Sequence, residues 1–187
     1  MTSPTSPEEP ETAAERVGVS DTVSSPIQHA HFHGGATPGM TDLLETYIQN
    51  REMVQPNHAN MLETAHGGNV LKWMDEVGAM SAMRFAENAC VTARIEGVDF
   101  ERPILVGDTA LIEAYVYEAG KTSVRVRLRT YRENPMTGER EKTTESYFVY
   151  VSIDDERRPT RVPSLTAESE EARELREEAL AGERSVE

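Results

Sequence analysis

The chain has 187 residues, enough for one domain with a single core, and it carries 33 acidic against 19 basic residues. The net charge of −14 argues against a nucleic acid or an anionic membrane as a partner, because binding phosphate requires clustered cations. The single cysteine excludes an intrachain disulfide and thiolate metal clusters, and we expect no transmembrane helix. The first fifteen residues contain no Lys or Arg, so we expect no secretory signal peptide and a cytoplasmic protein.

The acidic residues are concentrated in two tails. Residues 1–40 and 164–187 hold nine of the fourteen net negative charges, so residues 41–163 are only mildly acidic. The basic residues are sixteen Arg and three Lys. A high acid content with little Lys suggests adaptation to a salt-rich cytoplasm, an interpretation that a melting temperature independent of molar KCl would contradict.

The tails also differ from the middle in pattern. Residues 1–40 are rich in Ser, Thr, Pro, Glu and Gly without periodicity, so we predict a disordered acidic N-terminal tail. The tail contains His29, His31 and His33, which either bind a metal ion or are solvated histidines without a function. We favour the second interpretation and predict no metal site, because no other group nearby fixes the geometry of the three side chains. Residues 164–187 predict an acidic C-terminal tail, with a weakly docked or free helix near 168–180. The globular domain is expected at residues 41–163.

Hydrophobic periodicity predicts one strand, one long helix and four further antiparallel strands. The first strand is expected at residues 43–53, and the helix at residues 70–87, where Asn69 is a candidate N-cap. Alternation with a period of two marks the remaining strands near residues 91–95, 110–118, 124–129 and 147–153. One helix cannot cover such a sheet alone, so we predict a sheet wrapped around the helix, with a face and edges left for a partner.

One of these strands alternates apolar with basic side chains. Its three arginines are Arg125, Arg127 and Arg129. Because alternate residues of a strand point to the same face, the three guanidinium groups are expected on one side of the sheet. We predict that this side is an exposed or interface face rather than a nucleotide site.

Asp75 has an unusual place on the predicted helix. At 100° per residue it does not lie among the polar residues but in a stripe of small or apolar ones, which are Leu71, Gly78, Ala79, Ala82 and Ala86. Small residues let another surface approach closely, so we expect a partly desolvated carboxylate, which is a stronger base. The pattern leaves two interpretations open: a catalytic base or nucleophile, or an Asp at the edge of the polar face that pairs with Lys72.

The Gly67-Gly68 pair precedes the predicted helix. Backbone N–H groups at a helix start can bind an oxyanion or a phosphate, although a pair of glycines can also be an ordinary tight turn. His66 is a possible base, but a His here more often caps or packs. Gly68 and Asp75 are separated by roughly 10 Å along a helix axis, so a water or a second protomer is needed to bring both groups to one atom.

Several motifs resemble those of one family, the hotdog-fold acyl-CoA thioesterases. The main one is Asn60, followed after five intervening residues by His66-Gly67-Gly68 and then by Met74-Asp75-Glu76. Further fragments follow in the family's order over residues 43–163: Val91-Thr92-Ala93, Asp99-Phe100, Pro103-Ile104, Val106-Gly107-Asp108, Gly120 to Val124, and Lys142 to Val151. Glu63 and Thr64 depart from the small residues often found before His-Gly-Gly, so this loop is expected to differ in shape.

The resemblance implies an α+β hotdog fold, in which a five-stranded antiparallel sheet wraps around the long helix. It implies a homo-oligomer, a dimer that assembles further into a trimer of dimers. Asp75 matches the family's catalytic aspartate, and Asn60 matches an active-site asparagine contributed by the other protomer. Gly67 and Gly68 would polarise the thioester carbonyl, and Asp75 would act as general base or nucleophile; the sequence does not decide between them.

The resemblance also implies the substrate, an acyl-CoA thioester cleaved to free CoA and a fatty acid without another cofactor. The residues that match CoA-binding positions of the family are Arg84, Thr122, Ser123, Arg140 and Lys142. Two alternatives remain, a non-catalytic acyl-CoA sensor and a hotdog enoyl-CoA hydratase or dehydratase. The release of free thiol separates hydrolysis from both.

Overall fold

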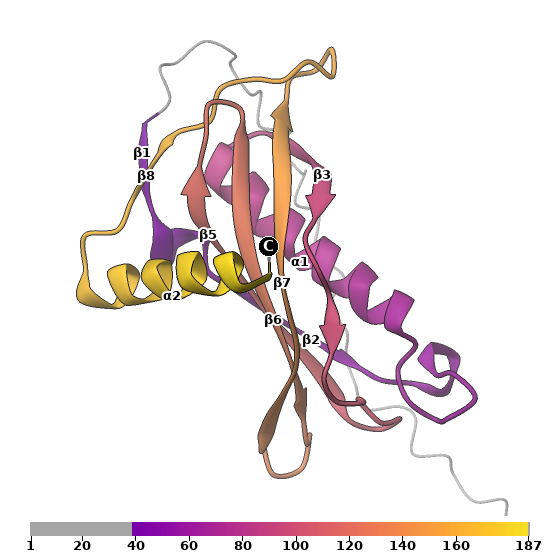
Figure 1. The fold of residues 1–187 in the computed structure, drawn as a ribbon. Helices are drawn as coiled ribbons and strands as arrows, with labels where there is room; N and C mark the ends of the chain where they lie inside the picture. Colours follow the sequence, from indigo (N-terminus) through magenta and orange to yellow (C-terminus); the bar gives the residue numbers. More distant parts are fainter. Residues whose placement is uncertain (1–38, 187) are drawn as a thin grey trace, which may run out of the picture. The chain divides into compact units, whose positions relative to one another are not determined.

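The computed structural model describes residues 39–186, and the predictions for the N-terminal tail and its histidines lie outside them. The main sheet is antiparallel, with the strand order β2-β5-β6-β7-β3, and a short β4 pairs with β7 (Figure 1). Its strands are β2 (Ile48–Met53), β3 (Ala89–Ile95), β4 (Asp99–Phe100), β5 (Thr109–Ala119), β6 (Ser123–Glu133) and β7 (Arg140–Ile153). A separate parallel pair joins β1 (Met40–Asp42) to β8 (Ser164–Thr166).

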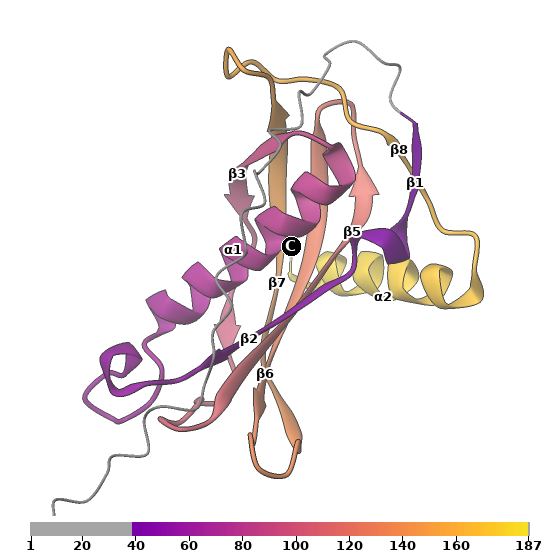
Figure 2. The same ribbon diagram turned by 180° about the vertical axis from the view of Figure 1, so that it is seen from behind.

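Helix α1 (Gly67–Ala86) packs against one face of this sheet (Figure 2). Its apolar residues recur every three or four positions, which places Val70, Trp73, Val77 and Phe85 in the core. Burying each large apolar side chain contributes about 1.5–3 kcal/mol, so this face fixes the helix to the sheet. The predicted long helix and the sheet wrapped around it are confirmed. None of the described helices is long and apolar enough to cross a membrane.

The start of α1 differs from the prediction. The N-cap is His66 and not Asn69, because the Nδ1 atom of His66 accepts a hydrogen bond from the backbone N–H of Gly68 at 3.1 Å. The side chain of Asn69 instead donates to the backbone oxygen of His58 at 3.0 Å. The helix ends at Ala86, where Glu87 adopts a left-handed conformation with a φ of 52°.

The first predicted strand is only partly correct. Residues Leu43–Thr46 form a 3₁₀ turn, η1, and the strand begins at Ile48. Asp42 causes this turn, since its Oδ1 accepts the N–H of Leu44 at 3.0 Å and thereby caps the segment. Leu43 is fully buried, so the turn directs an apolar residue inward where an extended segment was expected.

Helix α2 (Glu170–Val186) covers the opposite face of the main sheet (Figures 1 and 2). Ala172 and Ala179 are fully buried in a cluster that includes three tyrosines of the sheet, Tyr115, Tyr117 and Tyr147. The hydroxyl of Tyr115 donates to the backbone oxygen of Leu175 at 2.9 Å. The expectation of a weakly docked or free helix is therefore wrong.

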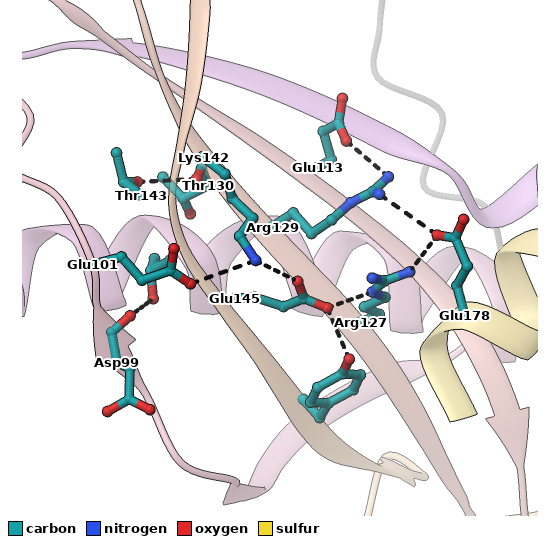
Figure 3. Close-up of polar contacts among 12 residues, drawn as sticks. Asp99, Glu101, Glu113, Arg127, Arg129, Thr130, Lys142, Thr143, Glu145 and Glu178 are labelled. Atoms are coloured by element: carbon teal, nitrogen blue, oxygen red, sulfur yellow. Dashed lines mark hydrogen bonds and ion pairs between the residues drawn. The ribbon is translucent and has the colours of Figure 1, made fainter. Parts of the chain in front are cut away.

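The three arginines of β6 form ion pairs with acidic residues of α2, and Figure 3 shows two of them, Arg127 and Arg129, with Glu178. Arg127 is 8% exposed; its Nη1 lies 3.0 Å from Oε2 of Glu178, and its Nε lies 2.7 Å from Oε1 of Glu145. Arg125 pairs with Glu183 of α2 in the same way. The prediction of an exposed or interface face is wrong, because the acidic residues of α2 neutralise this row of cations.

We predict that Arg127→Ala lowers the free energy of unfolding by about 3–5 kcal/mol, because it removes a buried cation and leaves the half-buried Glu145 with Lys142 as its remaining cationic partner. Chemical denaturation at a fixed protein concentration measures the loss. The control is Arg158→Ala, whose side chain is 70% exposed and pairs only at the surface, with an expected loss below about 1 kcal/mol. Equal effects of the two substitutions would contradict the structural role of the network.

Candidate active site

Asp75 lies half-buried in the middle of α1 and accepts two side-chain hydrogen bonds. The hydroxyl of Thr92 on β3 donates to Oδ1 at 2.5 Å, and the hydroxyl of Tyr150 on β7 donates to the same oxygen at 3.2 Å. Tyr150 also donates to the backbone oxygen of Asp75 at 3.1 Å. Lys72 pairs with Glu76 at 3.5 Å, so the alternative in which Asp75 pairs with Lys72 is wrong.

Gly78 makes this arrangement possible. A Cβ atom at this position would lie 2.3 Å from the hydroxyl oxygen of Tyr150, so a larger residue would exclude the tyrosine. The stripe of small residues on the helix thus admits another surface, as predicted, and the surface is β7 of the same chain. Burial and the neighbouring Asp75 carboxylate both raise the pKa of Tyr150, so its hydroxyl remains a hydrogen-bond donor.

The Asp75 carboxylate lies beside an edge of the sheet. Strand β3 pairs with β7 on one side, and no other described strand pairs with its outer edge. Val91 and Ile95 on this strand remain 46% and 39% exposed although they are apolar. An apolar strand with an open edge is suited to pairing with another strand, so Asp75 lies close to a surface that can receive a second chain.

Asn60 and Gly67 line a separate pocket of about 330 Å³ near the start of α1. Its walls include the apolar residues Val70, Phe100 and Ile104, whereas Asp75 is not among the lining residues. The structure therefore brings Asn60 and Gly67 together but does not bring Asp75 to them within one protomer. The amide N–H of Gly68 donates to His66, so it points to its own cap rather than to this pocket.

The loop after Asn60 is held by the Asn60 side chain. Its Oδ1 accepts the N–H of Leu62 at 2.8 Å, and its Nδ2 donates to the hydroxyl of Thr64 at 2.9 Å. Glu63 has a φ of 56°, a left-handed conformation that glycine adopts more easily. Glu63 thus adopts a left-handed conformation within a loop that the Asn60 side chain holds at Leu62 and Thr64.

The predicted substrate-binding residues lie at both ends of the β6–β7 hairpin. Thr122 and Ser123 lie at one end, and Ser123 is in register with Val151. Arg140 lies at the other end, about 33 Å away if each residue of the strand advances by about 3.3 Å. Its Nε lies 2.6 Å from Oε2 of Glu133. One protomer therefore does not bring these groups to one small site.

The two remaining predicted cations also have partners within the chain. Nζ of Lys142 lies 3.3 Å from Oε2 of Glu145 and 3.5 Å from Oε1 of Glu101, a bridge drawn in Figure 3. Arg84, in the last turn of α1, donates from Nη1 to the backbone oxygen of Tyr47 at 3.4 Å. A phosphate group at either residue would compete with these contacts.

Thr92 and Tyr150 were not among the predicted site residues. Both lie in fragments that carry the family resemblance, but their contacts join positions 17 and 75 residues from Asp75. The sequence feature that indicates this contact is Gly78, one helical turn after Asp75, because a glycine within a helix lets another element approach closely. The sequence does not reveal which residue makes that approach.

Comparison with known proteins identifies the family. Residues 62–139 match the sequence profile of the thioesterase superfamily. YkhA of Bacillus subtilis, an uncharacterized acyl-CoA thioester hydrolase, is 33% identical over 135 residues, which cover 72% of this chain and 78% of YkhA. The acyl-CoA thioester hydrolase YciA of Escherichia coli is 34% identical over 60% of this chain and 88% of YciA.

Solved structures agree. An apo-hexameric acyl-CoA thioesterase superposes with a TM-score of 0.71 at 36% identity, over 79% of this chain and 94% of that chain. An acyl-CoA hydrolase from Staphylococcus aureus, crystallised with butyryl coenzyme A and coenzyme A, gives 0.70 at 29% identity, over 76% and 87%. The chain therefore belongs to the thioesterase superfamily, and the prediction of a hotdog-fold thioester hydrolase is confirmed.

The contribution of the Glu145 carboxylate to the stability of the fold depends on pH. Burial alone would raise the pKa of Glu145, but hydrogen bonds from Arg127 and Tyr147 outweigh it and hold the pKa below its ordinary value. A lowered folded pKa stabilises the fold above the unfolded pKa, about 4.3 for Glu, and this stabilisation is lost as the pH falls through the folded pKa.

We predict that Glu145→Gln removes this contribution, so the difference in unfolding free energy between wild type and variant shrinks as the solution is acidified below about pH 4. Denaturant melts at several pH values between neutrality and pH 3 measure it. A difference that stays constant over this range would contradict the assignment.

Proposed function

We propose that this protein hydrolyses acyl-CoA thioesters to free coenzyme A and a carboxylic acid, with Asp75 as the catalytic carboxylate. The observation that carries the proposal is the Asp75 side chain, half-buried, held through Oδ1 by Thr92 and Tyr150, and placed beside the open edge of β3. The activity named for YkhA and YciA, and the coenzyme A bound to the S. aureus hydrolase, support the substrate class.

The choice of residues has support from the S. aureus enzyme. That hydrolase has been crystallised as three alanine variants, one each of an asparagine, an aspartate and a threonine. The three positions have the same sequence separations as Asn60, Asp75 and Thr92 in this chain. The agreement in residue type and in spacing supports the assignment of these three residues to the active site.

We infer that the complete site needs two protomers joined through β3. The other edge strand, β2, carries two charges, Arg51 and Glu52, which discourage strand pairing, and exposes one large apolar residue; β3 carries one charge and exposes two, Val91 and Ile95. Antiparallel pairing of two β3 strands about a twofold axis sets Asp75 of each protomer against its partner. Asn60 from the partner then completes the site, and similarity to hexameric thioesterases supports a trimer of dimers.

The chemistry requires no cofactor beyond the CoA of the substrate. Asp75 removes a proton from water, the water oxygen bonds to the thioester carbonyl carbon, and the C–S bond breaks as the proton passes to the departing thiolate. In the alternative, the carboxylate attacks the carbon directly and forms an anhydride that water then cleaves. The partner's Asn60 and the N–H groups near Gly67 would stabilise the developing oxyanion, a contribution of about 3–4 kcal/mol per donor.

The remaining predicted contacts concern the nucleotide part of CoA. We propose that Thr122, Ser123 and Arg84 contact CoA at one end of the sheet. Arg140 and Lys142 at the other end would serve a different protomer's substrate, because both ends of the hairpin cannot reach one CoA from the same chain. Their ion pairs with glutamates would then be exchanged for phosphate.

We predict that Asp75→Asn lowers the hydrolysis of acyl-CoA by at least about a hundredfold, because an amide neither accepts a proton nor attacks a carbonyl. Thiol release from a series of acyl-CoAs measures turnover, and size-exclusion chromatography checks that the oligomer is unchanged. Acyl-CoA binding without thiol release by the wild type would indicate a sensor, and reversible addition of water to an enoyl-CoA would indicate a hydratase.

A site shared between protomers predicts complementation. Asn60→Asp keeps the oxygen that holds its loop but loses the amide donor, so Asn60→Asp and Asp75→Asn oligomers should each be inactive. Chains refolded together at random should regain about a quarter of the wild-type activity, because half of the dimers then contain one intact site out of two. No recovery, with mixed dimers shown by differently tagged chains, would contradict a shared site.

A further inference from the structure

We propose that Tyr150 is a positioning residue for the reaction: its hydroxyl fixes the plane of the Asp75 carboxylate, so that Oδ2 is the oxygen that acts on the substrate. The inference rests on the proposed function and adds a residue to it. Tyr150 does not touch the substrate, since it is fully buried between the sheet and α1.

Tyr150 differs from the other buried tyrosines of the sheet. Tyr115, Tyr117 and Tyr147 belong to the cluster under α2, whereas Tyr150 belongs to the core beneath α1. Its single hydroxyl hydrogen is shared between two acceptors of Asp75, the backbone oxygen at 3.1 Å and Oδ1 at 3.2 Å. The tyrosine is therefore anchored to the helix backbone and to the carboxylate at once.

The two donors to Oδ1 have different rigidity. Thr92 is exposed on edge strand β3, whereas Tyr150 is fully buried on β7, which pairs with strands on both sides. A carboxylate with one donor can rotate about its bond to Cβ, while donors from two different strands, β3 and β7, restrict that rotation. Oδ2 accepts no hydrogen bond from any residue between 39 and 186, so the fixed orientation leaves this oxygen for the substrate or water.

Gly78 provides an independent argument. A glycine in the middle of a helix lowers the stability of the fold by roughly 0.5–1 kcal/mol relative to alanine. The space that Gly78 leaves for the Tyr150 hydroxyl gives a reason for a glycine at this position. A Cβ there would lie 2.3 Å from the hydroxyl oxygen but 3.1 Å from the ring carbon that bears it. The missing methyl group at Gly78 therefore makes room chiefly for the oxygen atom that reaches Asp75.

The test is Tyr150→Phe, which keeps the ring and removes only the hydroxyl. We expect kcat to fall roughly ten- to a hundredfold, the range for losing one hydrogen bond to a charged group, while KM changes by less than about twofold. The matched control is Tyr117→Phe, which removes a buried hydroxyl of the other cluster and should leave both constants near wild type. An unchanged kcat in Tyr150→Phe, or an equal loss in the control, would overturn the role.

Two combined variants separate positioning from a general loss of structure. Tyr150→Phe should cost nothing further in an Asp75→Asn background, because the tyrosine acts through that carboxylate. Gly78→Ala should lower kcat in the wild type and have a much smaller effect once the Tyr150 hydroxyl is removed. Additive losses in either pair would overturn the proposal.

The outcomes also distinguish this inference from the proposed function. If the wild type releases no thiol from acyl-CoA, or if Asp75→Asn keeps full turnover, the proposed function fails. If both of those tests succeed and only Tyr150→Phe behaves as wild type, the positioning role fails alone. Thermal melting and oligomer size of each variant confirm that the folded assembly is being compared.

Discussion

The close approach of α1 to β7 at Gly78 is the contact on which the site depends. It lets the hydroxyl of Tyr150 reach the helix backbone and the Asp75 carboxylate, at a point where any larger residue would separate the two elements. Thr92 adds a second donor from the edge strand. A carboxylate held in this way keeps one oxygen engaged and one oxygen available, which suits a group that acts on a carbonyl carbon or on water.

The second constraint is the way the sheet is covered. Helix α1 packs on one face, and α2 packs on the other through buried alanines and ion pairs to the β6 arginines. Edge strand β2 exposes Met53 and carries Arg51 and Glu52, whereas edge strand β3 exposes two apolar residues, Val91 and Ile95, and carries one charged residue, Arg94. The same strand carries Thr92, which places the Asp75 site beside the surface that a second protomer would pair with.

The parts that the sequence predicted are those with local signals. The 3.6-residue period of α1 and the alternation in β5 to β7 depend on neighbouring residues, and the motif around Asp75 lies within one helix. The turn at Leu43–Thr46 and the start of α1 were missed because each depends on one side chain, Asp42 or His66, acting as a cap. At both places a capping hydrogen bond, and not the spacing of apolar residues, determines where the helical segment begins.

The docking of α2 was missed for a different reason. Its glutamates are typical of a solvated helix, and the arginine that neutralises Glu178 lies 51 residues earlier in the chain. Tyr150 lies 75 residues from Asp75, so its role likewise appears only when the fold brings them together. Sequence patterns thus singled out the Asp75 carboxylate but not the groups that hold it.

In the proposed mechanism, one protomer's carboxylate and its partner's side-chain amide act on the same thioester. A crystal structure of the oligomer with an uncleavable thioether analogue of an acyl-CoA tests it most directly. We expect Asp75 of one protomer and the partner's Asn60 to lie within about 3.2 Å of the analogue's carbonyl group or of a water beside it. A carbonyl group bound away from Asp75, or contacted by Asp75 and Asn60 of the same protomer, would contradict it.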